Sequence, residues 1–152
     1  MRPLDRTDRL ILDILQRDGR IAISELATRV NLSTTPCSER VKRLERDGII
    51  TGYYARINPA LVDKNLLVFL EIKLSAKSGD VFDRVAHDLA QIPEVLECHY
   101  TTGNWSILIK IICRDNEHLM QLLNKKIQPI DGVSRTETYI SLEQQIERQI
   151  QL

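Results

Sequence analysis

The sequence has little cysteine and no long apolar run, and each shortage argues against a class of protein. Its three cysteines, Cys37, Cys98 and Cys113, are odd in number and widely spaced, with no CxxC pair. Such usage argues against a disulfide framework or a zinc site and is typical of a reducing cytoplasm. Charged residues interrupt every apolar stretch before it reaches membrane-spanning length, and the N-terminal MRPLDRTDR lacks the apolar core of a signal peptide. We therefore expect a cytoplasmic chain with no membrane partner.

The residue patterns of common catalytic sites are also missing. The three histidines, His87, His99 and His118, fall in separate segments with no shared motif. The sequence contains no recognisable nucleophile–base pair, paired acids, metal-ligand spacing or phosphate-binding loop. We therefore predict no catalytic residues, no metal and no cofactor.

A formal net charge of zero hides an uneven distribution of charge. Residues 1–58 hold 11 Lys and Arg against 8 Asp and Glu, whereas residues 59–152 hold 10 against 13. The basic share therefore lies in the first third of the chain, which is where phosphate binding would need it.

The most informative stretch is residues 23–48, ISELATRVNLSTTPCSERVKRLERDG. It predicts a short helix over 24–30 with its N-terminal serine as N-cap, then a left-handed turn residue at Asn31. A longer helix over 33–47 follows, with serine again as N-cap, and Gly48 ends it in the left-handed conformation. A short helix, a tight turn and a longer helix predict a helix-turn-helix.

A further helix precedes this motif and completes a three-helix core. It spans residues 5–18, with Asp5 at its start and Gly19 after its end. Each helix carries an apolar stripe at helical spacing. The stripes are Leu10, Ile11, Ile14 and Leu15 in the first helix, Leu26, Ala27 and Val30 in the second, and Cys37, Val41 and Leu44 in the third.

The other faces of the third helix carry small hydroxyls first and cations later. This order suits a helix whose N-terminal end approaches base edges while its later turns meet phosphates. The alternative is an ordinary solvated helix face. The predicted DNA-binding residues are Ser33, Thr34, Thr35, Ser38, Glu39, Arg40, Lys42, Arg43 and Arg46.

Residues 49–57 are rich in β-forming residues, with Gly52 as a turn or bulge point. We expect a short ribbon here, which makes the first domain, residues 1–58, a winged helix-turn-helix. Tyr53, Tyr54 and Arg56 are then candidates for contact with the DNA backbone, although the two tyrosines could equally pack against the third helix.

The rest of the chain predicts a linker over residues 59–65 and a second domain over 66–152. The element order βαββαβ is that of the ferredoxin-like fold, in which two helices cover one face of a four-stranded antiparallel sheet. The fold class is therefore α+β. The expected strands are 66–74, 95–102, 105–113 and 133–142, and the expected helices are 80–91 and 116–127.

The second face of this sheet stays partly apolar, with Leu67, Phe69, His99 and Trp105 as candidates. A bare apolar sheet face marks an interface. We therefore expect a homodimer, which also pairs two winged domains for a two-fold symmetric DNA site. Residues 143–152 are compatible with a helical tail or a frayed end.

These stretches together resemble the Lrp/AsnC family of bacterial and archaeal transcription regulators (feast/famine regulatory proteins), nearer its AsnC/Lrp-like branch. The similarity lies in LDRTDRLILDILQRDGR, in the pattern PCxxRVxRLExxGxI over residues 36–50, and in TTGNWS over 101–106. It implies a winged domain that binds double-stranded DNA. It also implies a second domain that dimerises, assembles dimers into tetramers or octamers, and binds a small amino-acid effector between dimers.

The resemblance also implies a site for that effector. Family members commonly carry Gly-Asp-x-Asp between the second and third strands, whereas this chain has Gly103-Asn104-Trp105-Ser106 and so lacks both carboxylates. An amide and a hydroxyl replace the strongest partners for an ammonium group. Plain packing is the alternative role of Trp105. The implied effector-binding residues are Thr102, Gly103, Asn104, Trp105, Ser106, Gln128, Thr136, Glu137 and Thr138.

Two other functions stay open from the sequence. Some haem-pathway decarboxylases resemble this family, and such an enzyme would need basic side chains or histidines converging on one pocket. A subunit that senses amino acids without binding DNA is the other alternative.

Overall fold

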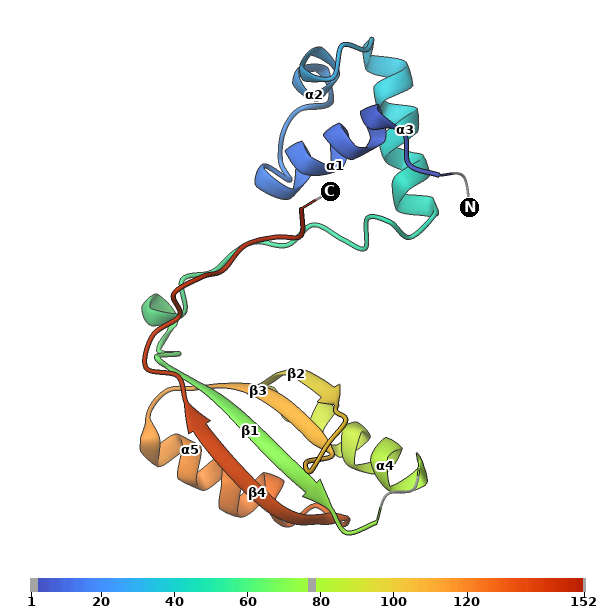
Figure 1. The fold of residues 1–152 in the computed structure, drawn as a ribbon. Coiled ribbons are helices and arrows are strands. Elements are labelled where there is room, and N and C mark those ends of the chain that lie inside the picture. Colours follow the sequence, from blue (N-terminus) through green and yellow to red (C-terminus); the bar gives the residue numbers. More distant parts are fainter. Residues whose placement is uncertain (1–2, 77–78, 152) are drawn as a thin grey trace. The chain divides into compact units, whose positions relative to one another are not determined.

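The computed structural model describes residues 3–76 and 79–151, and the chain forms two units (Figure 1). The first unit comprises the residues up to Arg56 together with those from Ile146 onward, and the second comprises Ile57–Gln145. The division after Arg56 lies close to the boundary expected at residue 58. Residues 146–151 lie in the first unit.

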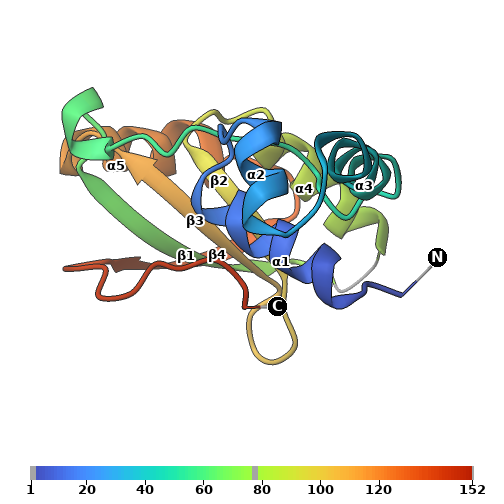
Figure 2. The ribbon, with the colours of Figure 1, turned by 90° about the horizontal axis from the view of Figure 1, so that it is seen from above.

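The first unit is built from three helices, α1 (Arg6–Arg17), α2 (Ile23–Arg29) and α3 (Thr34–Arg46). Figure 2 looks almost along α3 and shows α1 and α2 lying to one side of it. The predicted stripes of α2 and α3 are buried, whereas Leu10 of α1 is exposed and Leu12 takes a core position. The buried core comprises Ile11, Leu12, Leu26, Ala27, Val30, Cys37, Val41 and Leu44.

The ends of these helices largely follow the sequence signals. Asp5 caps α1, and Asn31 and Gly48 adopt the predicted left-handed conformation, with φ of 54° and 71°. The prediction of Ser24 as an N-cap is wrong, because α2 begins at Ile23 and Ser24 lies inside its first turn. Ile23 packs against the core, and this contact favours an earlier helix start.

The predicted ribbon over residues 49–57 is wrong as secondary structure, since no strand forms in this described stretch. A β-ribbon forms only when two segments pair, and residues 49–57 have no neighbouring segment that pairs with them as a strand. The stretch is fixed to the end of α3 instead, where the amides of Ile49 and Ile50 both donate to the carbonyl of Leu44, at 2.9 and 3.0 Å. Within the predicted linker, Pro59–Val62 forms a 3-10 turn, η1, capped by the Asn58 side chain.

The second unit has the predicted ferredoxin-like topology. Its sheet is antiparallel with the strand order β2-β3-β1-β4. The strands are β1 (Leu66–Leu74), β2 (Val95–Tyr100), β3 (Ile107–Cys113) and β4 (Val133–Ile140); the helices are α4 (Gly79–Ala90) and α5 (Asn116–Leu122), the latter continued by the π-helical turn η2 (Leu123–Ile127).

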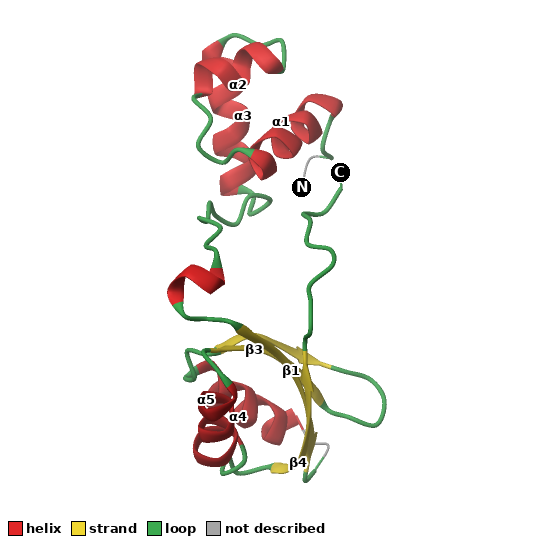
Figure 3. Ribbon diagram, turned by 90° about the vertical axis from the view of Figure 1, so that its left-hand side faces the viewer, coloured by secondary structure: helices red, strands yellow, loops and turns green. Residues whose placement is uncertain are grey.

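Both helices cover the same face of the sheet (Figure 3). The even-numbered residues 68 to 74 of β1 and the odd-numbered residues 107 to 113 of β3 point into this core, as the alternation predicts. Leu67 and Phe69 of β1 point to the opposite face and are half-buried. The expected partly apolar open face is therefore present in the isolated chain.

The connection between β2 and β3 is longer than the two-residue turn expected at Gly103-Asn104. It spans residues 101–106 and extends from the sheet on the side opposite the helices (Figures 2 and 3). Two bonds close its base, because the Thr101 amide donates to the Ser106 carbonyl and the Thr101 hydroxyl donates to the Trp105 carbonyl, each at 3.0 Å. Residues 101–102 and 105–106, which were expected to end the two strands, therefore belong to this loop.

The described end of the chain, residues 141–151, forms neither helix nor strand. Among the described residues, no helix is both long enough and apolar enough to cross a membrane.

Candidate nucleic-acid interface and ligand site

The exposed side of α3 carries a regular row of polar side chains. Thr35, Glu39, Lys42 and Arg46 are spaced i, i+4, i+7 and i+11, which places them on one face, opposite the buried stripe of the helix. We call these four residues the outer stripe, and all four are exposed. Lys42 has no ion pair with any residue that the structure describes, and Arg46 has only an exposed one, 3.5 Å from Asp47.

Three further predicted residues lie at the N-terminal end of the same helix. Ser33 occupies the N-cap position and makes no capping bond with its side chain. Ser33 and Thr34 are exposed, and Ser38 is half-buried on the flank of the outer stripe. Free hydroxyls at a helix N-terminus are suited to accept from or donate to base edges.

Arg40 and Arg43 lie on the other flank of α3, against the start of α1. Nη1 of Arg40 lies 2.6 Å from Oδ2 of Asp5 and 2.8 Å from Oδ1 of Asp8. Nη2 of Arg43 lies 2.6 Å from Oδ2 of Asp8, whose side chain is fully buried. We call these four residues the α1–α3 ion cluster. Unlike Lys42, the two arginines are thus already paired with carboxylates, and their contact with DNA stays a prediction.

The ion cluster is joined to the cap of α1. The Asp8 amide donates to Oδ1 of Asp5 at 2.8 Å, and the Asp5 amide donates to Oδ2 of Asp8 at 3.2 Å, so the two aspartates form a capping box. The hydrogen bond that Arg40 donates lowers the pKa of Asp5 to about 2, and the hydrogen bonds that Asp5 and Asp8 accept from Arg40 raise the pKa of Arg40. Both partners are therefore charged over the physiological range.

The tyrosines after α3 have different environments. The Tyr53 hydroxyl donates to Oε1 of Glu45 on α3 at 2.9 Å, which agrees with packing against that helix. Burial, followed by the Glu45 carboxylate, raises the pKa of Tyr53 to about 12. Tyr54 is 85% exposed, and Arg56 pairs with Glu147 near the end of the chain.

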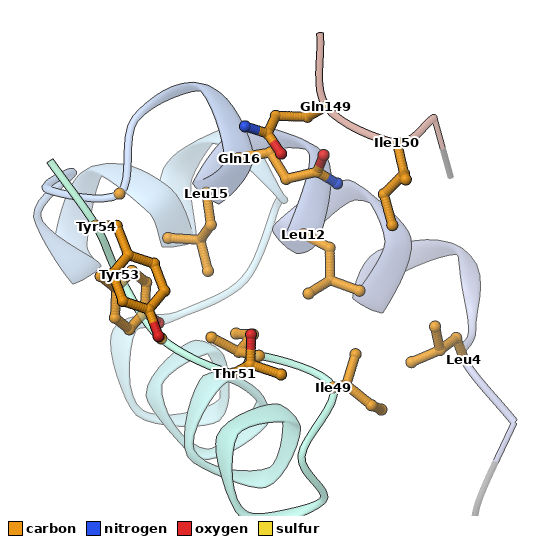
Figure 4. A pocket seen from close by; sticks show the side chains of 13 residues that line it. Leu4, Leu12, Leu15, Gln16, Ile49, Thr51, Tyr53, Tyr54, Gln149 and Ile150 are labelled. Atoms are coloured by element: carbon orange, nitrogen blue, oxygen red, sulfur yellow. The ribbon is translucent and has the colours of Figure 1, made fainter. Parts of the chain in front are cut away.

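A groove of about 360 Å³ lies between α1 and the segment after α3. Leu12 and Leu15 of α1 line one side, and Ile49 and Tyr53 line the other (Figure 4). Ile150, close to the end of the chain, points into this groove. No sequence pattern predicts this contact, because an isoleucine in a polar tail has no recognisable partner.

In the second unit, the predicted effector residues of the loop separate into two groups. Thr102, Gly103 and Asn104 are exposed at the tip. Ser106 is only 4% exposed, and its Oγ accepts from the Leu74 amide at 3.4 Å while its own amide donates to Ile72. The side chain of Ser106 therefore has a structural role in anchoring the loop to β1.

Trp105 contacts a residue that sequence reasoning missed. The guanidinium of Arg135 on β4 lies over the indole ring, 5.7 Å from its centroid. Arg135 also lines a surface hollow of about 380 Å³ together with Gln128 and Thr136, two of the predicted effector residues. Arg135 was visible in the sequence as a cation between Ser134 and Thr136. Only the pairing of β4 with β1, however, brings it close to the loop.

The other predicted effector residues lie elsewhere on β4. Thr138 is outside the hollow's lining. Glu137 lies opposite Glu71 on the paired strand β1, and the Tyr139 hydroxyl donates to Oε2 of Glu71 at 3.1 Å. Burial, followed by hydrogen bonds to these two carboxylates, raises the pKa of Tyr139 to about 12. The structure therefore groups Gln128 and Thr136 with Arg135. It places Glu137 apart from them, beside Glu71.

Comparison with known proteins assigns both units. Residues 4–51 match the family model described as winged helix-turn-helix DNA-binding, and residues 67–150 match the Lrp/AsnC ligand binding domain. The leucine-responsive regulatory protein of Escherichia coli K12 is 45% identical over 141 residues, which cover 93% of this chain and 86% of that protein.

Two solved structures resemble the whole chain. AsnC of Escherichia coli superposes with a TM-score of 0.91 at 36% identity, covering 99% of this chain and 100% of that one. A transcriptional regulator of Neisseria meningitidis in complex with L-Met also has a TM-score of 0.91, at 31% identity, covering 99% of this chain and 96% of that one.

Proposed function

We propose that this chain, which belongs to the Lrp/AsnC family of transcription regulators, binds duplex DNA through α3 and is controlled by a small amino acid bound to its second unit. The observation that carries the DNA-binding part is the outer stripe on α3. Hydroxyl, carboxylate and cationic side chains stand in one exposed row on the second helix of a helix-turn-helix, where the major groove accepts a helix.

Within the outer stripe, chemistry assigns different roles. Thr35 and Glu39, near the N-terminal end of α3, carry groups that pair with base edges, the carboxylate with the amino group of cytosine. Lys42 and Arg46, one turn and more further along, suit phosphate contacts, which fix position without reading sequence. The hydroxyls of Ser33, Thr34 and Ser38 extend the base-facing end.

The effector part of the proposal is supported by the ligand-binding family model and by the L-Met complex of the meningococcal relative. An amino acid carries a carboxylate and an ammonium group. Arg135 offers the carboxylate a charge-assisted hydrogen bond beside Gln128 and Thr136. Asn104 and the carbonyl groups of the exposed loop tip are the available partners for the ammonium.

Effector control follows from differential affinity. A ligand changes DNA binding only if it binds better to one arrangement of subunits than to another. The open face of the sheet, with Leu67 and Phe69, supports a homodimer as the smallest such arrangement. Assembly of dimers into tetramers or octamers, with the effector between them, is part of the same proposal.

A regulator is favoured over an enzyme, because the first unit matches a DNA-binding model and the second matches the Lrp/AsnC ligand binding domain. The decarboxylase alternative has no comparable observation in its favour. If the chain were instead a sensor subunit without DNA-binding activity, the purified chain would bind no duplex DNA. Selection of bound duplexes distinguishes this alternative from the proposed regulator.

The test is selection of bound duplexes from a randomised DNA library by the purified chain, repeated with each of the twenty amino acids. We expect enrichment of a two-fold symmetric sequence, and a change in its affinity with at least one amino acid. The matched control is the double variant Lys42→Ala/Arg46→Ala, which should retain less of every duplex because it lacks two phosphate contacts. Failure of the wild type to enrich any sequence would contradict the DNA-binding part, and indifference to all twenty amino acids would contradict effector control.

A further inference from the structure

The α1–α3 ion cluster joins two parts of the first unit that are far apart in the sequence. Arg40 is 35 residues from Asp5 and 32 residues from Asp8, and it contacts both. Asp8 receives Arg40 on one carboxylate oxygen and Arg43 on the other. The start of α1 is thereby fixed to the middle of α3 by three short ion pairs.

Asp8 is a buried charge that depends on these partners. Its side chain is 0% exposed, and those of Arg40 and Arg43 are 27% and 20% exposed. If a buried carboxylate loses its cationic partners, nothing offsets the free-energy penalty of its desolvation. Moving either arginine to a DNA phosphate would impose part of this cost, so phosphates compete for these two guanidinium groups at a disadvantage.

The geometry also sets which residues of α3 face outward. Arg40 and Arg43 are three residues apart, so they share one flank of the helix, and pairing with Asp8 holds this flank against α1. Rotation of α3 about its axis would separate these pairs. The outer stripe is therefore held in the outward position by the cluster on its flank.

We infer that Asp8 is a positioning and specificity-determining residue for DNA recognition, which withholds Arg40 and Arg43 from phosphates and orients the outer stripe towards the bases. This inference rests on the proposed DNA binding. It differs from the expectation that every cation of α3 contacts DNA, because it leaves Lys42 and Arg46 as the phosphate-binding cations of the helix. Fewer phosphate contacts weaken binding to all sequences, so a larger share of the affinity depends on the bases.

The decisive variant is Asp8→Asn, which keeps the size of the side chain and removes its charge. Two probes are needed, the duplex selected by the wild type and a duplex of random sequence, each titrated over a range of salt concentrations. We expect Asp8→Asn to tighten binding to the random duplex and to steepen the salt dependence by about 1, because it frees Arg43 while Arg40 keeps its ion pair with Asp5. The ratio of selected to random affinity should fall. A parallel loss of both affinities with an unchanged salt slope would overturn the inference, because that is the result of a purely structural role.

A second pair of variants decides the question if Asp8→Asn fails to fold by circular dichroism. Arg43→Ala and Lys42→Ala are adjacent on α3 and remove one cation each. Lys42→Ala should lower the salt slope by about 1, whereas Arg43→Ala should leave it unchanged. An equal decrease for both variants would refute the withholding of Arg43. A wild type that binds neither duplex would instead refute the proposed function, and the inference would fall with it.

Discussion

The guanidinium of Arg135 lies over the indole ring of Trp105, with its central carbon 5.7 Å from the ring centroid. The two residues come from β4 and from the loop before β3, strands that lie on either side of β1. The contact brings a cation to a loop in which the carboxylates common in the family are replaced by Asn104 and Ser106. The surface hollow lined by Arg135, Gln128 and Thr136 therefore offers a partner for a carboxylate group.

Arg135→Gln should weaken binding of the active amino acid by about tenfold or more, since a hydrogen bond to a charged group contributes about 1.5–3 kcal/mol. Calorimetric titration of the amino acid measures the effect. Arg114→Gln is the matched control, because Arg114 is an exposed arginine at the opposite end of β3, paired only with Asp115 among described residues. Equal affinities for Arg135→Gln and the wild type would remove Arg135 from the proposed site.

The lowered pKa of Asp5 predicts that the first unit loses stability as the pH falls. Its folded-state pKa of about 2 lies below the ordinary value of 3.8, chiefly because Arg40 donates to it. The carboxylate therefore stabilises the fold above about pH 4, and this contribution is lost as the pH falls towards 2.

The variant Asp5→Asn tests this response, because asparagine keeps an N-cap acceptor and loses only the charge. Its melting temperature should lie below that of the wild type at pH 7, and the gap should close between pH 4 and pH 2. Asp13→Asn removes a carboxylate from an exposed i, i+4 pair on the same helix and should have little effect at any pH. A gap for Asp5→Asn that persists at pH 2 would contradict the assigned role of charge.

Leu44→Ala should reduce the free energy of unfolding by about 2–5 kcal/mol, as removal of a fully buried leucine leaves a cavity. Leu44 is 0% exposed in the three-helix core, and its carbonyl also accepts the amides of Ile49 and Ile50. Urea denaturation followed by circular dichroism measures the loss. Leu10→Ala serves as control, because Leu10 is 42% exposed on α1 and should cost far less. Similar losses for both variants would argue against the described core.

Phe69→Glu should convert the expected homodimer into a monomer. Phe69 lies on the open face of β1 between Lys110 of β3 and Tyr139 of β4, and a second copy packed there would have to bury the new carboxylate. Sedimentation velocity reports the change in mass. Met120→Glu places the same charge at an exposed apolar position of α5 and should leave the mass unchanged. A dimeric Phe69→Glu would exclude this face as the interface.

Local patterns in the sequence determined most of the fold. Alternation in residues 66–74 gave β1 with both its bounds, and the apolar spacing of Cys37, Val41 and Leu44 gave the buried face of α3. Asn31 and Gly48 marked the turns, because few residues adopt positive φ at low cost. Such signals act over a few neighbouring residues, so they can be recognised before the chain folds.

Only the tertiary structure decided what the charged residues contact. Arg40 and Arg43 look like DNA-binding cations in the sequence, and they become partners of Asp5 and Asp8 because folding places α1 against α3. Arg135 likewise approaches Trp105 only through the order of the strands. A long side chain pairs with whatever charge the fold brings within about 4 Å. The separation of two residues along the chain does not predict that distance.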